Sequence, residues 1–450
     1  MPEDAELDEG EVVAGPVPFF GGAADYLGLE RNVVVMVAAG SLQGLGTMLW
    51  QGFTVKVLDA LGAASWMTGF YLTTGSLMGG LAPYPGGLLS DRLGRGRALI
   101  LASVLALAGF TVYLVAPTWW MFIPGAILLR FAGSFRFTGS LALTGDRLRE
   151  HRRAISVAAQ NVVGRLPQVI SPPLGGALIA FLVVSLKKRA QGAVAEERLE
   201  TLGLLAGFRA AVAITIVLTV ISVILQRRYY KLPPPQRDDG PLHPLHVFRS
   251  MRGQLKRLLL ADCLVRVGCR LYMGFIPLYI LNVLRRGYVE WGSLQALVGV
   301  TAILMYIPAA KLADRAGRAS RRPFVTATFF FFSLFPLVLV LAPSATAWLV
   351  PVFIISGLRE SGEPARKALI MDLAGRSGLG RQIGTYNMVR GIAMSLSPLL
   401  GGVLYGRNPV APFVLGGLVS GLGLVWFVLA GILFREEDVE GDRGPNEEDR

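Results

Sequence analysis

The chain has 450 residues, of which 53 % are hydrophobic and only 17 % are charged, and its mean hydropathy is +0.52. Soluble domains carry about 45–50 % apolar and about 25 % charged residues, so the composition excludes a disordered chain, a coiled coil, a collagen-like chain and an ordinary soluble enzyme. The formal charge is +13, and the only two cysteines, Cys263 and Cys269, share one apolar run, which excludes a disulfide framework or a cysteine-rich zinc site.

Acidic segments lie at both ends of the chain. Residues 1–31 hold eight acidic side chains and one arginine, and residues 435–450 hold eight acidic side chains and three arginines. The first segment is the opposite of the basic start of a signal peptide. We interpret both as solvated tails and assign them no chemistry. The bases between them separate hydrophobic runs at loop-sized intervals, which is typical of a membrane protein and not of a nucleic-acid-binding face.

Twelve predominantly apolar runs predict an all-α membrane protein, because about twenty apolar residues cross roughly 30 Å of hydrocarbon. Their bounds are 32–58, 64–89, 98–116, 119–143, 154–185, 202–226, 257–283, 290–312, 323–342, 345–372, 383–405 and 410–434. The stretch 227–256, with three consecutive prolines and an Asp-Asp-Gly turn, interrupts this rhythm at mid-chain. We interpret it as a linker between an N-terminal bundle, 32–226, and a C-terminal bundle, 257–434.

Basic residues in the connections set the expected orientation. One set of loops contains Arg92, Arg95, Arg97, Arg147, Arg149, Arg152, Arg153, Arg227, Arg228, Lys231, Arg237, Arg315, Arg318, Arg321, Arg322, Arg376 and Arg381. The opposite set has only Lys187, Lys188, Arg189, Arg198, Arg285, Arg286 and Arg407. Because cytoplasmic loops carry the excess of Lys and Arg, we expect the first set, the linker and both termini to be cytoplasmic. The expected location is the plasma membrane.

The two predicted bundles share short sequences in the same order. Gly52-Phe53 recurs as Gly274-Phe275, and SDRLGR at 90–95 recurs as ADRAGR at 313–318. The segment SPPLGG at 171–176 recurs as SPLLGG at 397–402. Three matches at nearly constant spacing and at equivalent span positions indicate a duplicated six-helix unit.

The loop GLLSDRLGR at 87–95 resembles the signature loop of the major facilitator superfamily, and AKLADRAGR at 310–318 resembles its second copy. Gly96 stands where the family often has a base, and Ala310 replaces a glycine. The resemblance, which covers 32–434, implies two pseudo-symmetric six-helix bundles that rock about a central site. It also implies a cytoplasmic latch formed by Gly87, Asp91, Arg92, Gly94, Arg95, Asp314, Arg315, Gly317 and Arg318. The alternative is a basic turn with glycines for tight geometry.

The SPPLGG segment partly resembles a fifth-helix motif of the same superfamily that is associated with exchangers, although Ser171 stands where a glycine is expected. Physically, its prolines favour a kink and its glycines favour close helix contacts. The residues assigned to this packing role are Pro172, Gly175, Gly176, Pro398, Gly401 and Gly402. A structural role is sufficient for them, and the exchanger implication stays open.

Charged residues inside the predicted spans are the candidate functional residues, because a charge at mid-bilayer normally faces a cavity or a partner. The candidates for the substrate cavity are Arg130, Arg136, Arg165, Arg266, Arg270, Arg359 and Arg390. One interpretation is structural: ion pairs such as Asp262–Arg266 and Arg359–Glu363, each four residues apart on one helix face, lock helices together. The other is functional, since arginines outnumber acids in the spans and pairing cannot neutralise them all. That surplus favours an anionic group on the substrate.

A proton carrier must be a carboxylate or a histidine, because arginine stays protonated. The histidines His151, His243 and His246 all fall in predicted loops. The remaining candidates are Glu363, Glu360 and Asp262. We favour Glu363, which precedes Pro364, where a broken helix can flex.

These patterns predict a secondary active transporter of a small organic solute, an anionic or polar metabolite first, driven by protons as symporter or antiporter. The nearest alternative is a proton-coupled multidrug efflux antiporter, and an alternative of another class is a non-transporting sensor or assembly protein on the same fold. We expect a monomer in the lipid bilayer without cofactor, metal or nucleic-acid partner. The chain contains no G-x-x-x-x-G-K-[ST] phosphate loop and no H-E-x-x-H metalloprotease motif, so we expect no enzyme.

Overall fold

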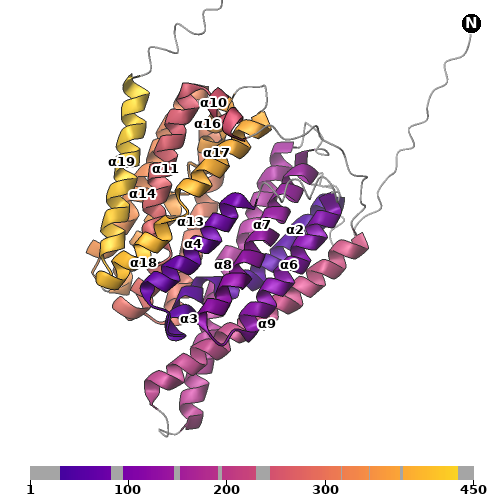
Figure 1. Ribbon diagram of the computed structural model, residues 1–450, viewed down its shortest axis with the longest axis vertical. Helices are drawn as coiled ribbons and strands as arrows, with labels where there is room; N and C mark the ends of the chain where they lie inside the picture. The colour runs from indigo at the N-terminus through magenta and orange to yellow at the C-terminus, as the bar shows by residue number, and fades with distance from the viewer. Residues whose placement is uncertain are drawn as a thin grey trace, which may run out of the picture.

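The computed structural model describes residues 31–82, 95–145, 153–190, 195–229, 244–315, 317–343, 345–374 and 379–433, and within these ranges the regular structure is entirely helical. The first part of the chain forms α2 (Arg31–Trp50), α3 (Thr54–Ala60), α4 (Ser65–Leu81), α6 (Arg95–Val115), α7 (Phe122–Gly145), α8 (Arg153–Ala190) and α9 (Glu196–Tyr229). Figure 1 shows these helices, indigo to magenta, as one bundle, next to a second bundle in pink to yellow.

The second bundle contains α10 (Pro244–Ser250), α11 (Gly253–Met273), α12 (Ile276–Leu278), α13 (Tyr288–Arg315), α14 (Gly317–Leu341), α15 (Thr346–Leu358), α16 (Glu363–Ala374), α17 (Leu379–Ala393), α18 (Ser397–Arg407) and α19 (Ala411–Leu433). Eight helical segments in the described ranges are long and apolar enough to cross a membrane. The other four predicted spans coincide with α2–α3, α4, α7 and α15–α16. The predicted all-α membrane fold is confirmed.

Within the described residues, four of the predicted spans are broken. The repeated Gly-Phe pairs mark two of the breaks: α2 gives way to a 3-10 turn at Gln51–Phe53, and α11 ends just before Gly274. The other two breaks are residues 359–362, between α15 and α16, and residues 394–396, between α17 and α18. Discontinuous helices in transporters commonly border the substrate and ion sites, because their ends present unpaired backbone groups.

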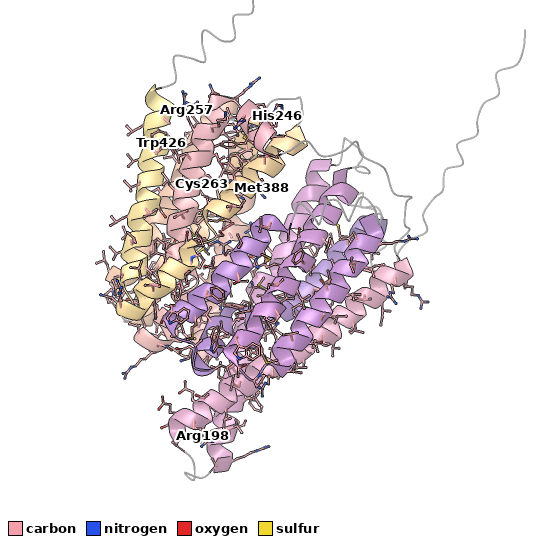
Figure 2. The ribbon with its side chains drawn as sticks, viewed as in Figure 1. Arg198, His246, Arg257, Cys263, Met388 and Trp426 are labelled. Carbon is pink, nitrogen blue, oxygen red and sulfur yellow. The ribbon has the colours of Figure 1, made fainter. Side chains whose placement is uncertain are left out.

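Two helices are longer than a membrane requires. α8 and α9 have 38 and 34 residues, or about 57 Å and about 51 Å at 1.5 Å per residue. The predicted spans 154–185 and 202–226 are therefore parts of longer helices. Lys187 Nζ lies 2.6 Å from Glu196 Oε1 and joins the two ends across the turn. The resulting hairpin projects from the bundles in Figure 1, with Arg198 near its tip in Figure 2.

Glycines of the repeated segments allow helices of one bundle to touch. A Cβ on Gly175 would overlap the carbonyl oxygen of Leu49 in α2, and a Cβ on Gly401 would overlap that of Leu271 in α11. The two contacts are equivalent in the duplicated halves, since Gly175 and Gly401 occupy the same place in the repeat. Only a residue without a side chain permits such backbone contact.

The neighbouring glycines join one bundle to the other. A Cβ on Gly176 of α8 would overlap a carbonyl of α13, and a Cβ on Gly402 of α18 would overlap a carbonyl of α4. In return, Gly292 of α13 and Gly69 of α4 meet carbonyls of α8 and α18. The bundles thus meet along two pseudo-symmetric seams, α8 with α13 and α4 with α18.

Polar contacts reinforce these seams at the end of the bundles away from the linker. Trp291 Nε1 donates to the Gly52 carbonyl at 2.9 Å. Asn282 accepts from Lys56 Nζ at 2.6 Å and donates to Asp59 Oδ2 at 3.0 Å. Among the described residues, the two bundles are therefore in close contact at the end away from the linker. The distribution of basic residues predicts that this end is extracytoplasmic.

Gly175→Ala is expected to lower the midpoint of thermal unfolding, because the added methyl group must displace the α2 backbone, and overpacking costs about 1–3 kcal/mol. Gly164→Ala is the matched control: it lies in the same helix, and nothing lies within 4 Å of its Cβ position. The measurement is thermal unfolding of the purified proteins in detergent. Equal midpoints for the two variants would contradict the close contact of α8 with α2.

Candidate functional site

A buried carboxylate joins three helices of the second bundle. Asp262 of α11 is completely buried, and its Oδ2 accepts hydrogen bonds from Arg366 Nη1 at 2.7 Å, Tyr386 Oη at 3.0 Å and Arg390 Nη1 at 3.1 Å. Arg266 Nε lies 3.5 Å from its Oδ1. These donors come from α11, α16 and α17. A buried charge with this many partners holds its helices firmly, because losing the charge leaves the partners uncompensated.

Glu363 is the second carboxylate of the same cluster. It is the first residue of α16, where the helix dipole favours a negative charge. Its Oε2 accepts from Arg366 Nη2 at 2.7 Å, and its Oε1 pairs with Arg266 Nη2. We call Asp262, Arg266, Glu363, Arg366, Tyr386 and Arg390 the Asp262 cluster. Within it, Arg266 and Arg366 each contact both carboxylates.

The expected pair Arg359–Glu363 is corrected. Its spacing places both residues on one face of a continuous helix, but the helix is interrupted at residues 359–362, so the four-residue register does not apply. Glu363 pairs with Arg266 and Arg366 instead. Gly362 permits the interrupted segment to pack closely on α14, because a Cβ there would overlap the Phe324 carbonyl.

The neighbours of the Arg359 guanidinium are aromatic rings and not the carboxylate of Glu363. This guanidinium is 8 % exposed and lies 5.4 Å from the Phe332 ring and 5.8 Å from the Phe335 ring. Its Nε and Nη1 have no hydrogen-bond partner among the described residues. Arg266 lies over the same Phe332 ring at 4.6 Å. The ring faces attract the two cations without neutralising them.

Two further arginines approach each other from different bundles. Arg270 lies two turns beyond Asp262 on α11, and Arg130 lies on α7, against Gly75 of α4. The two guanidiniums are within electrostatic range of each other, and Arg270 is also within range of Arg266 and Arg390. Neither Arg130 nor Arg270 forms an ion pair with a carboxylate in the described part of the chain. Positive charge is therefore in excess where the bundles face each other.

One ion pair crosses between the bundles at the interrupted helix. Arg165 Nη2 of α8 lies 3.6 Å from Glu360 Oε2, and the two side chains are 21 % and 29 % exposed. Both residues were cavity or coupling candidates from the sequence, and here they contact each other. Rocking of the bundles must change this distance.

Arg136 lies elsewhere. Its Nη1 donates to Gln43 Oε1 of α2 at 2.8 Å, and Gln43 Nε2 donates to Ser103 Oγ of α6 at 2.8 Å. Ser103 in turn bonds with Gln226 of α9. This polar chain is internal to the first bundle, so Arg136 is not brought together with the Asp262 cluster. Because these glutamines carry no charge, the pattern of charged residues in the spans does not indicate them.

Sequence reasoning also missed Tyr386. Its hydroxyl is one of the three hydrogen-bond donors to Asp262 Oδ2, and its ring lies 5.9 Å from the Arg390 guanidinium. The available signal is its position four residues before Arg390 on the same helix, which places both on one face.

The structure describes the two packing prolines but only some of the predicted latch residues. The carbonyl oxygens of Pro172 and Pro398 are the atoms that face Gly292 and Gly69 in the two seams. The latch residues Gly87, Asp91, Arg92 and Gly94 lie outside the described residues. Arg95, Asp314, Arg315, Gly317 and Arg318 are described only as backbone at the ends of α6, α13 and α14. The latch stays a prediction.

Comparisons with known proteins agree with this architecture. The family model of the Major Facilitator Superfamily matches residues 33–398 and again residues 258–450. A search of curated protein sequences finds no match.

Solved structures resemble the whole fold. The human organic anion transporter MFSD10 (TETRAN) is 15 % identical with a TM-score of 0.61, covering 88 % of this chain and 99 % of its own. A POT family transporter in complex with 5-aminolevulinic acid is 12 % identical with a TM-score of 0.70, covering 91 % and 97 %. A bacterial homologue of the iron transporter ferroportin in the inward-facing state is 15 % identical with a TM-score of 0.62, covering 89 % and 98 %.

At these identities the structural matches establish the fold and not the substrate. The match to the family model spans most of the chain and includes both bundles. This multi-pass membrane protein therefore belongs to the major facilitator superfamily, a family of secondary transporters and not of enzymes.

Proposed function

We propose that this secondary transporter moves a small anionic solute by alternating access and couples that movement to protons. The observation that carries the proposal is the pair Arg130 and Arg270, which approach from different bundles without a carboxylate partner in the described residues. An anion between them would be held by both bundles at once. In this family, substrate sites lie near the membrane midplane between the repeats.

Charge in the surroundings favours an anion over a cation. The Asp262 cluster has three guanidiniums against two carboxylates, and Arg359 and Arg270 add two further cations from the same bundle. Glu360 is already paired with Arg165. A cationic drug would meet a repulsive site, so the structure favours the anion over the multidrug alternative. Two structural neighbours, an organic anion transporter and a POT family transporter in complex with 5-aminolevulinic acid, are consistent with this choice.

Glu363 is our proposed proton site. It shares Arg266 and Arg366 with Asp262, and its side chain keeps 12 % exposure while that of Asp262 has none. A proton on Oε1 of Glu363 would release Arg266 and raise the local positive charge by one, which strengthens anion binding. Asp262, with three hydrogen-bond donors on one oxygen, is better suited to hold the helices. Glu360 remains the second candidate, because its pairing crosses the bundles.

The contacts of the bundles support a conformer closed on the extracytoplasmic side. The α8–α13 and α4–α18 seams lie at the end away from the linker, which the basic loops place outside. The proposed location is the plasma membrane with both termini cytoplasmic, as a monomer. Symport and antiport both remain compatible with this geometry.

Arg130→Gln and Arg270→Gln are expected to weaken anion binding by about 10- to 100-fold each, because a hydrogen bond to a charged group contributes about 1.5–3 kcal/mol. The measurement is ligand-dependent thermal stabilisation of the purified protein against mono- and dicarboxylates, organophosphates and cationic dyes. A hit is then confirmed by flux into proteoliposomes.

Arg209→Gln is the matched control, since Arg209 is an exposed arginine whose recorded contact is the Ala116 carbonyl at 3.4 Å, away from the paired arginines. Stabilisation by cationic dyes and not by anions would favour the multidrug alternative. Unchanged anion affinity in both cavity variants would overturn the assignment of Arg130 and Arg270. No stabilisation and no flux with any compound would favour a non-transporting role.

A further inference from the structure

A glutamine at the contact between the bundles has no hydrogen-bond partner for its amide nitrogen. Gln295 lies on α13, one turn after Trp291, whose Nε1 donates to the Gly52 carbonyl. The amide of Gln295 lies against Gly52 itself, because a Cβ on that glycine would overlap Oε1 and Nε2. Nε2 is buried and has no hydrogen-bond partner among the described residues. A buried polar group without a partner destabilises the folded protein.

The duplicated bundle has a leucine at the equivalent place. Gly69 of α4 and Gly292 of α13 are the equivalent glycines of the two seams, and each lies four residues after the start of its helix. Three residues further along the two helices are Leu72 and Gln295. Leu72 also lies against the repeat of Gly52, since a Cβ on Gly274 would overlap its Cδ1. An apolar side chain therefore fits this place, and packing does not require the amide.

The amide lies near the depth of Arg130 and Arg270. Gly274 comes one turn after Arg270, or about 6 Å further along the axis of α11. Because the two halves are related by an axis along the membrane normal, Gly52 lies at the depth of Gly274. The amide of Gln295 is therefore about one turn closer than Arg270 to the end away from the linker. Arg270 is within electrostatic range of Arg130, so a small anion between these arginines can reach the amide with its other end.

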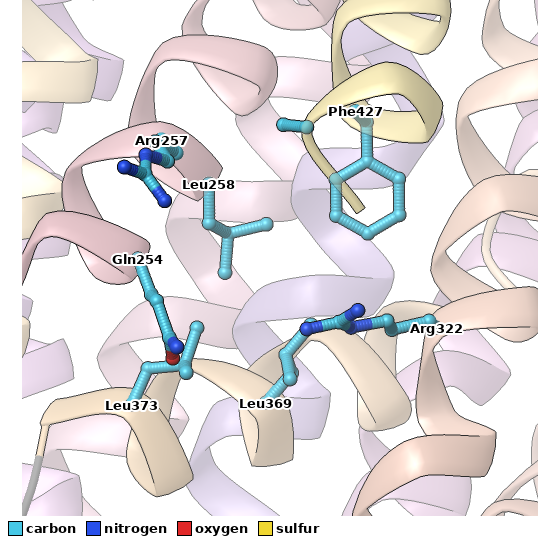
Figure 3. Close-up of a pocket in the computed structure, with 8 residues that line it drawn as sticks. Gln254, Arg257, Leu258, Arg322, Leu369, Leu373 and Phe427 are labelled. Carbon is cyan, nitrogen blue, oxygen red and sulfur yellow. The ribbon is translucent and has the colours of Figure 1, made fainter. Parts of the chain in front are cut away.

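The polar side chains at the pocket in Figure 3 differ from Gln295 in this respect. The pocket lies at the linker end of the second bundle, between α11, α14, α16 and α19. Its polar lining residues Gln254, Arg257 and Arg322 each already interact with another group. Nε2 of Gln295 has no such partner in the described part of the chain, so it is available to a solute.

We propose that Gln295 is a specificity-determining residue of the transport site and donates a hydrogen bond from Nε2 to an uncharged oxygen of the solute. This inference rests on the proposed function and narrows the substrate class to small anions that also carry a carbonyl or hydroxyl oxygen. Arg130 and Arg270 hold the charge, and the amide selects for the oxygen. A site that hydrogen-bonds such a group rejects the analogue that lacks it, because the buried amide then stays unpaired.

Matched pairs of anions test this proposal on the purified full-length protein. The pairs are acetoacetate with butyrate, malate with succinate, and glycerol phosphate with propyl phosphate, and only the first member of each pair has the additional oxygen. The affinity of each anion is measured from its thermal stabilisation of the wild type and of Gln295→Leu, which introduces the residue of the equivalent place. Ser293→Leu is the matched control, because Ser293 is exposed on the opposite side of α13.

In the wild type we expect the oxygen-bearing member of at least one pair to bind about 5- to 100-fold more tightly than its analogue. Gln295→Leu should abolish this preference, keep the affinity for the analogue, and leave the unfolding midpoint without solute equal or higher. Gly52→Ala should reduce the preference as well, because the added methyl group displaces the amide. Gly274→Ala displaces Leu72 instead and should retain the preference.

Anion binding that is weakened by Arg130→Gln but shows no preference within any pair, or a preference that Gln295→Leu retains, would overturn this inference alone. An equal loss of affinity for both members of a pair, together with a lowered unfolding midpoint, would show that Gln295 acts through packing and would overturn it too. If none of these anions stabilises the wild type, the proposed function and this inference are overturned together.

Discussion

Asp262→Asn is expected to destabilise the protein by about 3–5 kcal/mol, the cost of removing one partner from a buried ion pair. The amide is nearly the same size, so the loss comes from charge and not from volume. Arg366, Arg390 and Arg266 would then share the single charge of Glu363. The measurement is the yield of monodisperse protein and its midpoint of thermal unfolding.

Tyr386→Phe is the graded control for this prediction. It removes one hydrogen bond to Asp262 and leaves all charges in place, so the expected loss is about 1.5–3 kcal/mol, below that of Asp262→Asn. Adding Arg390→Gln to Asp262→Asn should recover part of the lost stability, because it removes one uncompensated cation. A variant Asp262→Asn that melts like the wild type would show that the cluster does not hold α11, α16 and α17 together.

Much of the fold follows from local composition and repetition. The apolar runs and the repeated segments predict helix positions, because a helix that crosses lipid needs about twenty predominantly apolar residues and equivalent positions of a duplication fold alike. The glycines of the repeated SPPLGG and SPLLGG segments predict close helix packing at Gly175 and Gly402, and the structure shows the backbone contacts that they permit. Such predictions need only the local sequence, a few helical turns at a time.

The ion pairs could not be predicted in the same way. Arg359 and Glu363 have the spacing of partners, but the helix is interrupted at residues 359–362, where Gly362 packs on α14. Of the two actual partners of Glu363, Arg366 is three residues away and Arg266 is 97 residues away. Position along a predicted span also does not reveal the direction of a side chain. Arg136 lies on the same span as Arg130, yet its guanidinium bonds to Gln43 inside the first bundle. Rotation of each helix about its own axis depends on all its neighbours.

Ion pairing nevertheless divides the candidate arginines into two groups, which the sequence alone does not distinguish. Arg266, Arg366 and Arg390 are bound to carboxylates, and Arg165 is bound to Glu360. Among the described residues, Arg130 and Arg270 have no such partner, and they lie on different bundles. We propose that the paired arginines hold helices or respond to protons and that Arg130 and Arg270 bind the anion.

Glu363→Gln is expected to uncouple solute movement from protons while leaving solute binding in place. In wild-type proteoliposomes, one proton per solute allows about tenfold accumulation per unit of pH difference, since one unit is worth about 1.4 kcal/mol. The amide cannot take up a proton, so the variant should equilibrate the anion found by thermal stabilisation without accumulating it. Exchange of labelled for unlabelled solute should continue, because Arg130 and Arg270 are intact.

Glu290→Gln is the matched control, since Glu290 lies at the start of α13, 3.8 Å from Arg286, and apart from the cluster. Glu360→Gln separates the second candidate: it breaks the ion pair to Arg165 across the bundles and should change the rate of exchange without abolishing accumulation. If Glu363→Gln still accumulates solute with the pH difference and Glu360→Gln does not, the proton site moves to Glu360. The cross-bundle ion pair would then itself be the element that protonation opens, because neutral Glu360 no longer attracts Arg165.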